Sequence, residues 1–226
     1  MNSLSNIKPD QNNQSKLEKL ITIMKNSGFL NENKLETAIR NTPRYEFVPT
    51  SLREKAYDDI PLPIMNNQTI SQPSVVSRMT EWLDVNEGQK ILEVGTGSGW
   101  QTAILSYLVR SGQVYTIERD SELVAFAKEN LNKLKITNVK VILGNGSFGF
   151  VEESPFDRII ITATCKKIPP PLLEQLSVNG LLIAPVGEYL SSLVLLKKTS
   201  KGISEIKNES GYAFVPLLGE SDKEKY

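Results

Sequence analysis

The chain has 226 residues, of which 39% are hydrophobic, enough to bury one sizeable core. Its 26 basic and 26 acidic side chains balance, so no overall positive field favours a nucleic-acid partner. Because histidine is absent and Cys165 is the single cysteine, histidine-based catalysis, the usual zinc sites and an internal disulfide are excluded. No apolar stretch is typical of a signal peptide or a membrane span, so we expect a cytoplasmic protein without membrane contact.

The N-terminal part of the chain predicts helices and irregular structure. Residues 1–14 are rich in Asn, Ser and Gln, and we expect them to form a mobile tail. The spacing of apolar residues predicts helices over 17–24, 32–40 and 75–83. Prolines interrupt residues 45–73 too often for a long regular element. We therefore expect residues 15–87 to form a cover of helices and loops.

Beyond residue 88, apolar runs alternate with helical stretches, which is typical of a parallel sheet covered on both faces. The predicted strands are residues 90–94, 113–118, 139–143, 158–162, 181–185 and 193–197. A helix over 121–134 follows the second strand, capped by Asp120 or Ser121. We predict an α/β fold with a doubly wound, mainly parallel sheet over residues 88–219, in one structural domain with the N-terminal cover. Residues 220–226 are charged and are expected to form a second tail.

The most informative motif is a glycine-rich loop after the first predicted strand. Gly95, Gly97 and Gly99 follow Glu93 at alternate positions and lead into a helical stretch. Glycine lets such a loop turn sharply and lets a ligand approach the backbone, beside the first N–H groups of the helix. A dinucleotide fingerprint has a small residue where Trp100 stands, so the pattern resembles instead the first motif of class I methyltransferases, which binds S-adenosylmethionine. A plain strand–helix turn is the alternative.

An acidic residue, Glu118, ends the next predicted strand, where its carboxylate could accept hydrogen bonds from both hydroxyls of a ribose. Ligands of doubly wound sheets sit beyond the carboxyl ends of the strands. Gly95, Asn145 and Thr162 are predicted at the same edge. The sequence therefore predicts a Rossmann-like cofactor site there.

Motifs along most of the chain resemble those of the protein-L-isoaspartate O-methyltransferase family. The matching segments include Phe47-Val48-Pro49, Pro61-Leu62-Pro63-Ile64, Gln68-Thr69-Ile70-Ser71-Gln72-Pro73, Leu92 to Gly99, Pro155-Phe156-Asp157, Pro185-Val186-Gly187 and, as the closing strand, Phe214-Val215-Pro216-Leu217. The resemblance implies the class I methyltransferase fold, S-adenosylmethionine as methyl donor and S-adenosylhomocysteine as product. It also implies methylation of the α-carboxylate of L-isoaspartyl residues in damaged proteins and peptides, which starts repair through a succinimide. No metal is implied, and we expect a monomer.

The resemblance also implies the roles of individual residues. The serine of the Thr-Ile-Ser-Gln-Pro loop is the one usually named catalytic in the family, and it corresponds to Ser71; a helix cap is the alternative for this residue. The implied cofactor-binding residues are Thr69, Ile70, Gln72, Glu93, Gly95, Thr96, Gly97, Ser98, Gly99, Glu118, Asn145 and Gly146. The implied substrate-binding residues are Asp59, Pro61, Leu62 and Pro63, which an ordinary turn would also explain.

One departure from the family concerns Asn145, which stands where the family has an aspartate that accepts a hydrogen bond from the adenine amino group. Asparagine keeps an acceptor but loses the charge, so we expect weaker cofactor binding. Three other functions stay open: a carboxylate methyltransferase for a dedicated peptide, a catalytically weak cofactor-binding module, and a nucleic-acid or small-molecule methyltransferase. The charge balance and the lack of an Asn-Pro-Pro-aromatic motif oppose the last of these.

Overall fold

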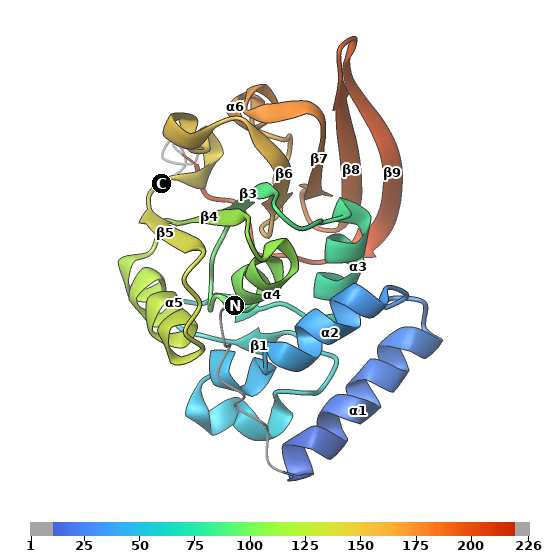
Figure 1. The fold of residues 1–226 in the computed structure, drawn as a ribbon, viewed down its shortest axis with the longest axis vertical. Helices are drawn as coiled ribbons and strands as arrows, with labels where there is room; N and C mark the ends of the chain where they lie inside the picture. The colour runs from blue at the N-terminus through green and yellow to red at the C-terminus, as the bar shows by residue number, and fades with distance from the viewer. Residues whose placement is uncertain (1–10, 220–226) are drawn as a thin grey trace.

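The computed structural model describes residues 11–219, so the predicted tail 220–226 and most of the predicted tail 1–14 lie outside the described residues. Its main feature is a seven-stranded sheet in the order β5-β4-β3-β6-β7-β8-β9 (Figure 1). The strands are β3 (Lys90–Val94), β4 (Gln113–Glu118), β5 (Val139–Leu143), β6 (Phe156–Ile161), β7 (Leu176–Gly187), β8 (Ser191–Thr199) and β9 (Gly202–Tyr212). The first five in this order are parallel, and β8 and β9 are antiparallel. The predicted doubly wound, mainly parallel sheet is confirmed.

The N-terminal elements before α3 gather at the end of the molecule opposite the tip of the β8–β9 hairpin, and α3 lies between them and the sheet (Figure 1). They are α1 (Gln11–Asn26), α2 (Asn33–Asn41), η1 (Arg44–Phe47), η2 (Thr50–Lys55), β1 (Leu62–Pro63), β2 (Thr69–Ile70) and α3 (Pro73–Leu83). The helix α1 begins inside the segment 1–14 that was expected to be a tail. Its polar first turn extends a helix whose buried face starts at Leu17, and helical spacing alone does not reveal such an extension.

Three helices follow strands of the sheet: α4 (Trp100–Val109), α5 (Ser121–Lys133) and α6 (Pro170–Glu174). Two short 3-10 turns, η3 (Gly146–Phe148) and η4 (Val151–Glu153), lie between β5 and β6. The cap of α5 is Asp120, whose Oδ1 accepts the N–H groups of Glu122 and Leu123 at 2.8 and 3.2 Å. Of the two predicted capping residues, Asp120 is the one that caps α5.

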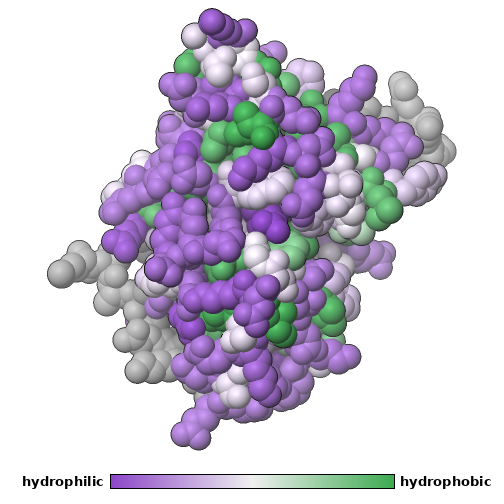
Figure 2. All heavy atoms as spheres, turned by 90° about the vertical axis from the view of Figure 1, so that its right-hand side faces the viewer, coloured by the Kyte–Doolittle hydropathy of each residue, from purple (hydrophilic) through white to green (hydrophobic). Residues whose placement is uncertain are grey.

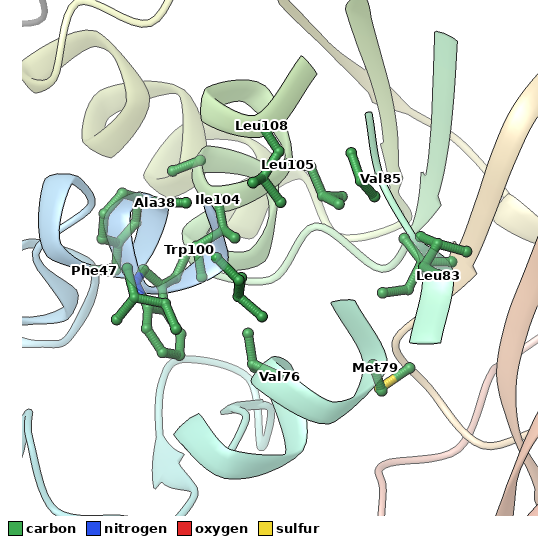
Figure 3. Close-up of a cluster of buried hydrophobic side chains, with 14 of the residues drawn as sticks. Ala38, Phe47, Val76, Met79, Leu83, Val85, Trp100, Ile104, Leu105 and Leu108 are labelled. Atoms are coloured by element: carbon green, nitrogen blue, oxygen red, sulfur yellow. The ribbon is translucent and has the colours of Figure 1, made fainter. Parts of the chain in front are cut away.

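Alternate residues of the central strands pack into two separate cores, one on each face of the sheet. Ile91 and Ile160 belong to the larger core, whereas their neighbours Leu92 and Ile159 belong to the smaller one. In the larger core, α4 packs against α2, η1 and α3, as Figure 3 shows around Trp100. This packing attaches the N-terminal cover to the helix that follows the glycine loop.

The last strand, β9, was not predicted. Almost all of its residues are exposed, and its sequence is mostly polar, so no apolar alternation marks it. It is a strand because it pairs with β8 along nearly its whole length. The side of the molecule that carries β9 is largely hydrophilic (Figure 2). The expected closing strand over 214–217 is instead irregular, with a single bridge between Pro216 and Thr164.

Candidate active site

A cavity of ≈ 450 Å³, here called the first cavity, lies beyond the carboxyl ends of β3 and β4. The loop after β3 and the end of β4 form one side. The β2–α3 connection and residues 214–218 form the other side. The topology of the sheet therefore gathers segments from the N-terminal, central and C-terminal parts of the chain around one space.

The glycine loop is held in place from both sides. Gly95 and Gly97 have φ angles of +96° and +53°, a region that side chains disfavour. A Cβ on Gly95 would lie 2.3 Å from Thr162 Oγ1, and this hydroxyl donates a 2.7 Å hydrogen bond to the Gly95 carbonyl. On the other side, the Gly97 N–H donates to Glu118 Oε2 at 3.0 Å. Only glycine fits at position 95, so the loop backbone itself forms the cavity wall.

Glu118 presents a nearly buried carboxylate at the first cavity, with 8% of its surface exposed. Its Oε1 accepts the N–H groups of Arg119 and Asp120 at 2.8 and 3.1 Å, and within residues 11–219 it forms no ion pair. A carboxylate oxygen can accept more than one hydrogen bond, so room remains for hydroxyl donors of a ligand. A negative charge without a cationic partner also suits a ligand that carries positive charge. Both properties fit S-adenosylmethionine, a sulfonium ion with a ribose.

A second cavity of ≈ 480 Å³ adjoins the first. Five residues line both cavities: Thr69, Ser71, Thr162, Phe214 and Val215. Within the described residues the Ser71 hydroxyl has no hydrogen-bond partner, so it is available to a bound molecule. The predicted catalytic serine therefore stands at the boundary between two adjoining spaces.

The alternative that Ser71 caps a helix does not match the geometry. The N-cap of α3 is Gln72, which makes no capping hydrogen bond through its side chain. The Ser74 N–H donates instead to Asp59 Oδ1 at 2.8 Å. Asp59 thus caps α3, and within the described residues the Ser71 hydroxyl makes no hydrogen bond that would stabilise the helix.

The family model described as protein-L-isoaspartate(D-aspartate) O-methyltransferase matches residues 14–222. The chain is 47% identical over 207 residues to the protein-L-isoaspartate O-methyltransferase of Pyrococcus horikoshii, covering 91% of this chain and 94% of that protein. It is 45% identical over 206 residues to the Methanopyrus kandleri protein of the same name, covering 90% of this chain and 91% of that protein.

The chain belongs to the protein-L-isoaspartate(D-aspartate) O-methyltransferase family.

Solved structures agree with this membership. A structure described as a protein-L-isoaspartate O-methyltransferase superposes with a TM-score of 0.80 at 29% identity, covering 90% of this chain and 66% of that chain. A Plasmodium falciparum structure of the same description, in complex with S-adenosyl-L-homocysteine, gives a TM-score of 0.80 at 27% identity, covering 92% of this chain and 99% of that one. The family resemblance read from the sequence motifs is confirmed.

Most of the residues expected at the cofactor line the first cavity. They are Thr69, Ile70, Gly95, Thr96, Gly97, Ser98, Glu118 and Gly146. Four others do not line it: Gln72 lines the second cavity, and Gly99, Glu93 and Asn145 line neither. Gly99 is the N-cap of α4, with φ +88° and with space for a Cβ limited by Ala127 at 3.4 Å. Thr162, which the sequence predicts at the sheet edge without a role, lines the first cavity and bonds the Gly95 carbonyl.

Asn145 acts as a cap. Its Oδ1 accepts the Ser147 N–H at 3.0 Å and the Ser147 hydroxyl at 2.8 Å, which fixes the start of η3. The next residue, Gly146, lines the first cavity, and a Cβ there would lie 2.4 Å from Val94 Cγ1. Asn145 therefore stands directly behind a cavity residue, with its acceptor oxygen already used.

The expected substrate strip is only partly at a cavity. Pro61 lines the second cavity, whereas Leu62 is buried in the β1–β2 hairpin opposite Ile70. Asp59 accepts hydrogen bonds from Gln72 Nε2 and the Ser74 N–H. Neither Asp59 nor Pro63 is a lining residue of the two cavities. The strip therefore contacts the β2–α3 connection and the start of α3 through Asp59.

Glu93 lies buried in the core between β3 and α4. It is fully buried, its Oε2 accepts the Thr102 hydroxyl, and its Oε1 has no partner among the described residues. Burial raises the pKa of Glu93 to about 8, and the charge of Glu118 adds to the rise, against the hydrogen bonds of Thr102 and Thr116. The family motif thus places an acid where it joins β3 to α4 and does not line the cavity.

A pH-dependent stability follows from Glu93. In the unfolded chain a glutamate ionises near 4.5, whereas in the fold the pKa of Glu93 is about 8. Between these values the folded state binds more protons, so this residue's contribution to stability is lost as the pH rises toward 8. Glu93→Gln should therefore raise the free energy of unfolding, relative to the parent, more at pH 8 than at pH 5. Urea unfolding at several pH values measures this.

The control for Glu93→Gln is Glu129→Gln. Glu129 is an exposed residue of α5 whose pKa is lowered by a hydrogen bond from Lys133. This variant should show no such gain with rising pH. A difference between Glu93→Gln and the parent that stays constant from pH 5 to pH 8 would contradict a raised pKa at Glu93.

Proposed function

We propose that this chain transfers the methyl group of S-adenosylmethionine to the α-carboxylate of L-isoaspartyl residues in damaged proteins and peptides. The observation that carries the proposal is the meeting of two cavities at Ser71, one edged by the glycine loop and Glu118 and the other without them. A two-substrate transfer needs two adjoining sites with the reacting atoms at their boundary. Family membership supports the same activity.

The first cavity is proposed as the cofactor site. S-adenosylmethionine, when bound, supplies an electrophilic methyl group. Glu118 would hold the ribose hydroxyls, and the backbone of the loop from Gly95 to Ser98 would hold the methionyl part. The apolar side chains of Met79, Ile117 and Leu123 are also part of the wall.

The second cavity is proposed as the place of the isoaspartyl segment. A carboxylate acceptor is already ionised at neutral pH, so the residues around it need to align it and need not remove a proton. The chain has no histidine, which suits a reaction without a general base. Ser71 would donate a hydrogen bond to the acceptor carboxylate and orient one oxygen toward the first cavity.

The direct test is methyl transfer from radiolabelled S-adenosylmethionine to an isoaspartyl peptide, beside the same peptide with ordinary aspartate. We expect base-labile label, diagnostic of a methyl ester, on the isoaspartyl peptide only. Equal labelling of both peptides would favour a different carboxylate methyltransferase. Cofactor binding without any transfer would favour the non-catalytic module.

After release the ester is proposed to collapse to a succinimide, because methoxide leaves more readily than hydroxide when the following amide nitrogen attacks. Hydrolysis of the succinimide yields normal aspartate in a fraction of the substrate molecules. Repair would therefore need only the methylation step from the protein.

We also propose two parts with separate tasks: a cover over residues 15–87 and a cofactor-binding core over residues 88–219. Residues from the cover and the core meet at the first cavity, as do Ser71 and Glu118.

A cytoplasmic monomer is proposed as well, and light scattering after size exclusion tests its mass. No helix among residues 11–219 combines the length and apolar character that crossing a membrane requires.

Asn145→Asp is expected to tighten the binding of S-adenosylhomocysteine by about 0.5–1.5 kcal/mol. One carboxylate oxygen can keep the bonds to Ser147, and the other replaces an amide donor by a charged acceptor for the adenine amino group. Repulsion from nearby Glu118 could reduce the gain by raising the pKa of the new acid. Calorimetry between pH 6 and 8 measures both effects.

The control is Asn145→Ala, which removes the cap without adding an acceptor and should not tighten binding. Affinity that is the same in the aspartate variant and the parent at every pH would place position 145 outside the adenine contact.

A further inference from the structure

Arg44, the first residue of η1, is a buried cation with an unusual set of partners. Only 1% of its surface is exposed, and within residues 11–219 it forms no ion pair with a carboxylate. Its guanidinium donates instead to main-chain carbonyls of four residues: Ala56 at 2.6 Å, Ile60 at 3.1 Å, Ile70 at 3.5 Å and Ser71 at 3.0 Å. Burial lowers the pKa of Arg44 to about 10, so the side chain stays charged at neutral pH.

These carbonyls belong to two segments that are far apart in the sequence. Ala56 and Ile60 enclose the turn that carries Asp59. Ile70 lines the first cavity, and Ser71 lines both cavities. Arg44 Cζ also lies 5.3 Å from the ring centroid of Trp100, the first residue of α4 and a lining residue of the first cavity. One side chain thus contacts the Asp59 turn, the Ser71 loop and the helix that follows the glycine loop.

A buried cation without a carboxylate partner is a costly way to fill space, since an apolar side chain of similar size would pack without losing hydration. What an apolar residue cannot do is bind several carbonyls at once. A lysine would keep the charge but has a single ammonium group in place of a planar fork of donors. The partners of Arg44 therefore require arginine in particular.

We propose that Arg44 is a positioning residue for methyl transfer: by binding the carbonyls of Ile70 and Ser71, it fixes the Ser71 hydroxyl at the boundary of the two cavities. This proposal rests on the proposed function, in which that hydroxyl aligns the acceptor. It assigns Arg44 no contact with either substrate.

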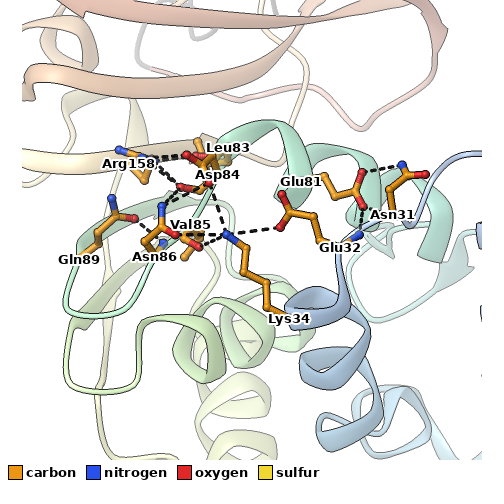
Figure 4. Close-up of polar contacts among 10 residues, drawn as sticks. All are labelled: Asn31, Glu32, Lys34, Glu81, Leu83, Asp84, Val85, Asn86, Gln89 and Arg158. Carbon is orange, nitrogen blue, oxygen red and sulfur yellow. Dashed lines mark hydrogen bonds and ion pairs between the residues drawn. The ribbon is translucent and has the colours of Figure 1, made fainter.

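The chain offers a matched control in Arg158. Its guanidinium also binds main-chain carbonyls, those of Leu83, Asp84 and Asp157, and it is 8% exposed. It lies at the C-terminal end of α3, where Figure 4 shows it with Asp84, whereas the Ser71 loop enters the N-terminal end of the same helix. Arg158 lines neither cavity. Both arginines tie loops to the fold, but only Arg44 binds the Ser71 loop.

The first experiment compares Arg44→Lys with Arg158→Lys. Circular dichroism and thermal melting identify the temperature at which each variant is folded, and kcat, KM for an isoaspartyl peptide and Kd for S-adenosylhomocysteine are measured there. We expect Arg44→Lys to lower kcat about tenfold or more, with Kd changed about twofold or less, because misplacing an aligning group slows the transfer itself. Arg158→Lys should lower the melting temperature and leave kcat within about twofold of the parent. Equal losses of kcat in the two variants would overturn the proposal.

The second experiment is a double-mutant cycle with Ser71→Ala. If Arg44 acts through the Ser71 hydroxyl, Arg44→Lys should cost much less in kcat when that hydroxyl is already absent. A purely structural arginine would cost the same factor in both backgrounds, and that result would overturn the proposal. If Arg44→Lys does not fold, Arg44→Gln, which keeps two donors on one nitrogen, takes its place in the cycle. A parent protein that methylates no isoaspartyl peptide would count against the proposed function, whereas an active parent with additive variants counts against Arg44 alone.

Discussion

Ser71→Ala should lower kcat for an isoaspartyl peptide while leaving the fold and the affinity for S-adenosylhomocysteine nearly unchanged. The hydroxyl makes no hydrogen bond within the described residues and lies at the boundary of both cavities, so its removal costs no structural contact. Losing one aligning hydrogen bond to a charged acceptor should cost about 1–3 kcal/mol in the transition state, a factor of about five to 150 in rate. Steady-state kinetics with saturating cofactor measures the effect.

Ser77→Ala is the matched control for Ser71→Ala. Ser77 lies in α3, a few residues along the chain, and its hydroxyl donates to the Phe29 carbonyl at 2.6 Å. Its removal should lower the free energy of unfolding and leave kcat unchanged, the reverse of the pattern expected for Ser71. Unchanged turnover in Ser71→Ala would remove this serine from the mechanism, and a loss of stability instead of rate would make it a structural residue.

The parallel strands β3, β4 and β6 could be predicted because nearly all of their residues are buried, so each appears in the sequence as an apolar run. The edge strand β5 has only half-buried and exposed residues, and its valines and isoleucine mark it. The bounds of β3, β4 and β5 agree with the predicted residues. β9 could not be predicted in this way, because its residues are exposed and its pairing with β8 alone makes it a strand. Where burial does not determine the residues, the sequence carries no periodic signal.

At the site too, the residues that strand ends place could be predicted, whereas those that distant segments bring together could not. The glycine loop and Glu118 follow directly from strand ends, so the sequence locates them correctly at the first cavity. The placement of Glu93 against α4, away from the cavity, depends on side-chain direction within β3, which alternates from one face to the other. The second cavity is built partly from Phe29 and from residues 209–215, and no local pattern joins these segments. The role of Arg44 appears only when its four carbonyl partners are placed around it.

Glu118→Ala should weaken the binding of S-adenosylhomocysteine far more than it changes KM for the peptide. Glu118 lines the first cavity without an ion-pair partner among residues 11–219, and it is absent from the lining of the second cavity. A hydrogen bond to a charged group contributes about 1.5–3 kcal/mol, so loss of one such bond should weaken binding about tenfold to a hundredfold. Glu118→Gln, which keeps an acceptor but loses the charge, should fall between the parent and Glu118→Ala. Calorimetry provides the three dissociation constants.

A weaker affinity alone does not separate two causes, because Glu118 also accepts the Gly97 N–H and so holds the glycine loop. Analogues of S-adenosylhomocysteine that lack a ribose hydroxyl distinguish them. If Glu118 binds the hydroxyls, removing one from the ligand should weaken binding to the parent by about tenfold and binding to Glu118→Ala hardly at all, since the interaction is already missing. If Glu118 acts only through the loop, the analogue loses the same factor in both proteins. That second result would place the ribose away from Glu118 and leave this carboxylate as a support of the glycine loop.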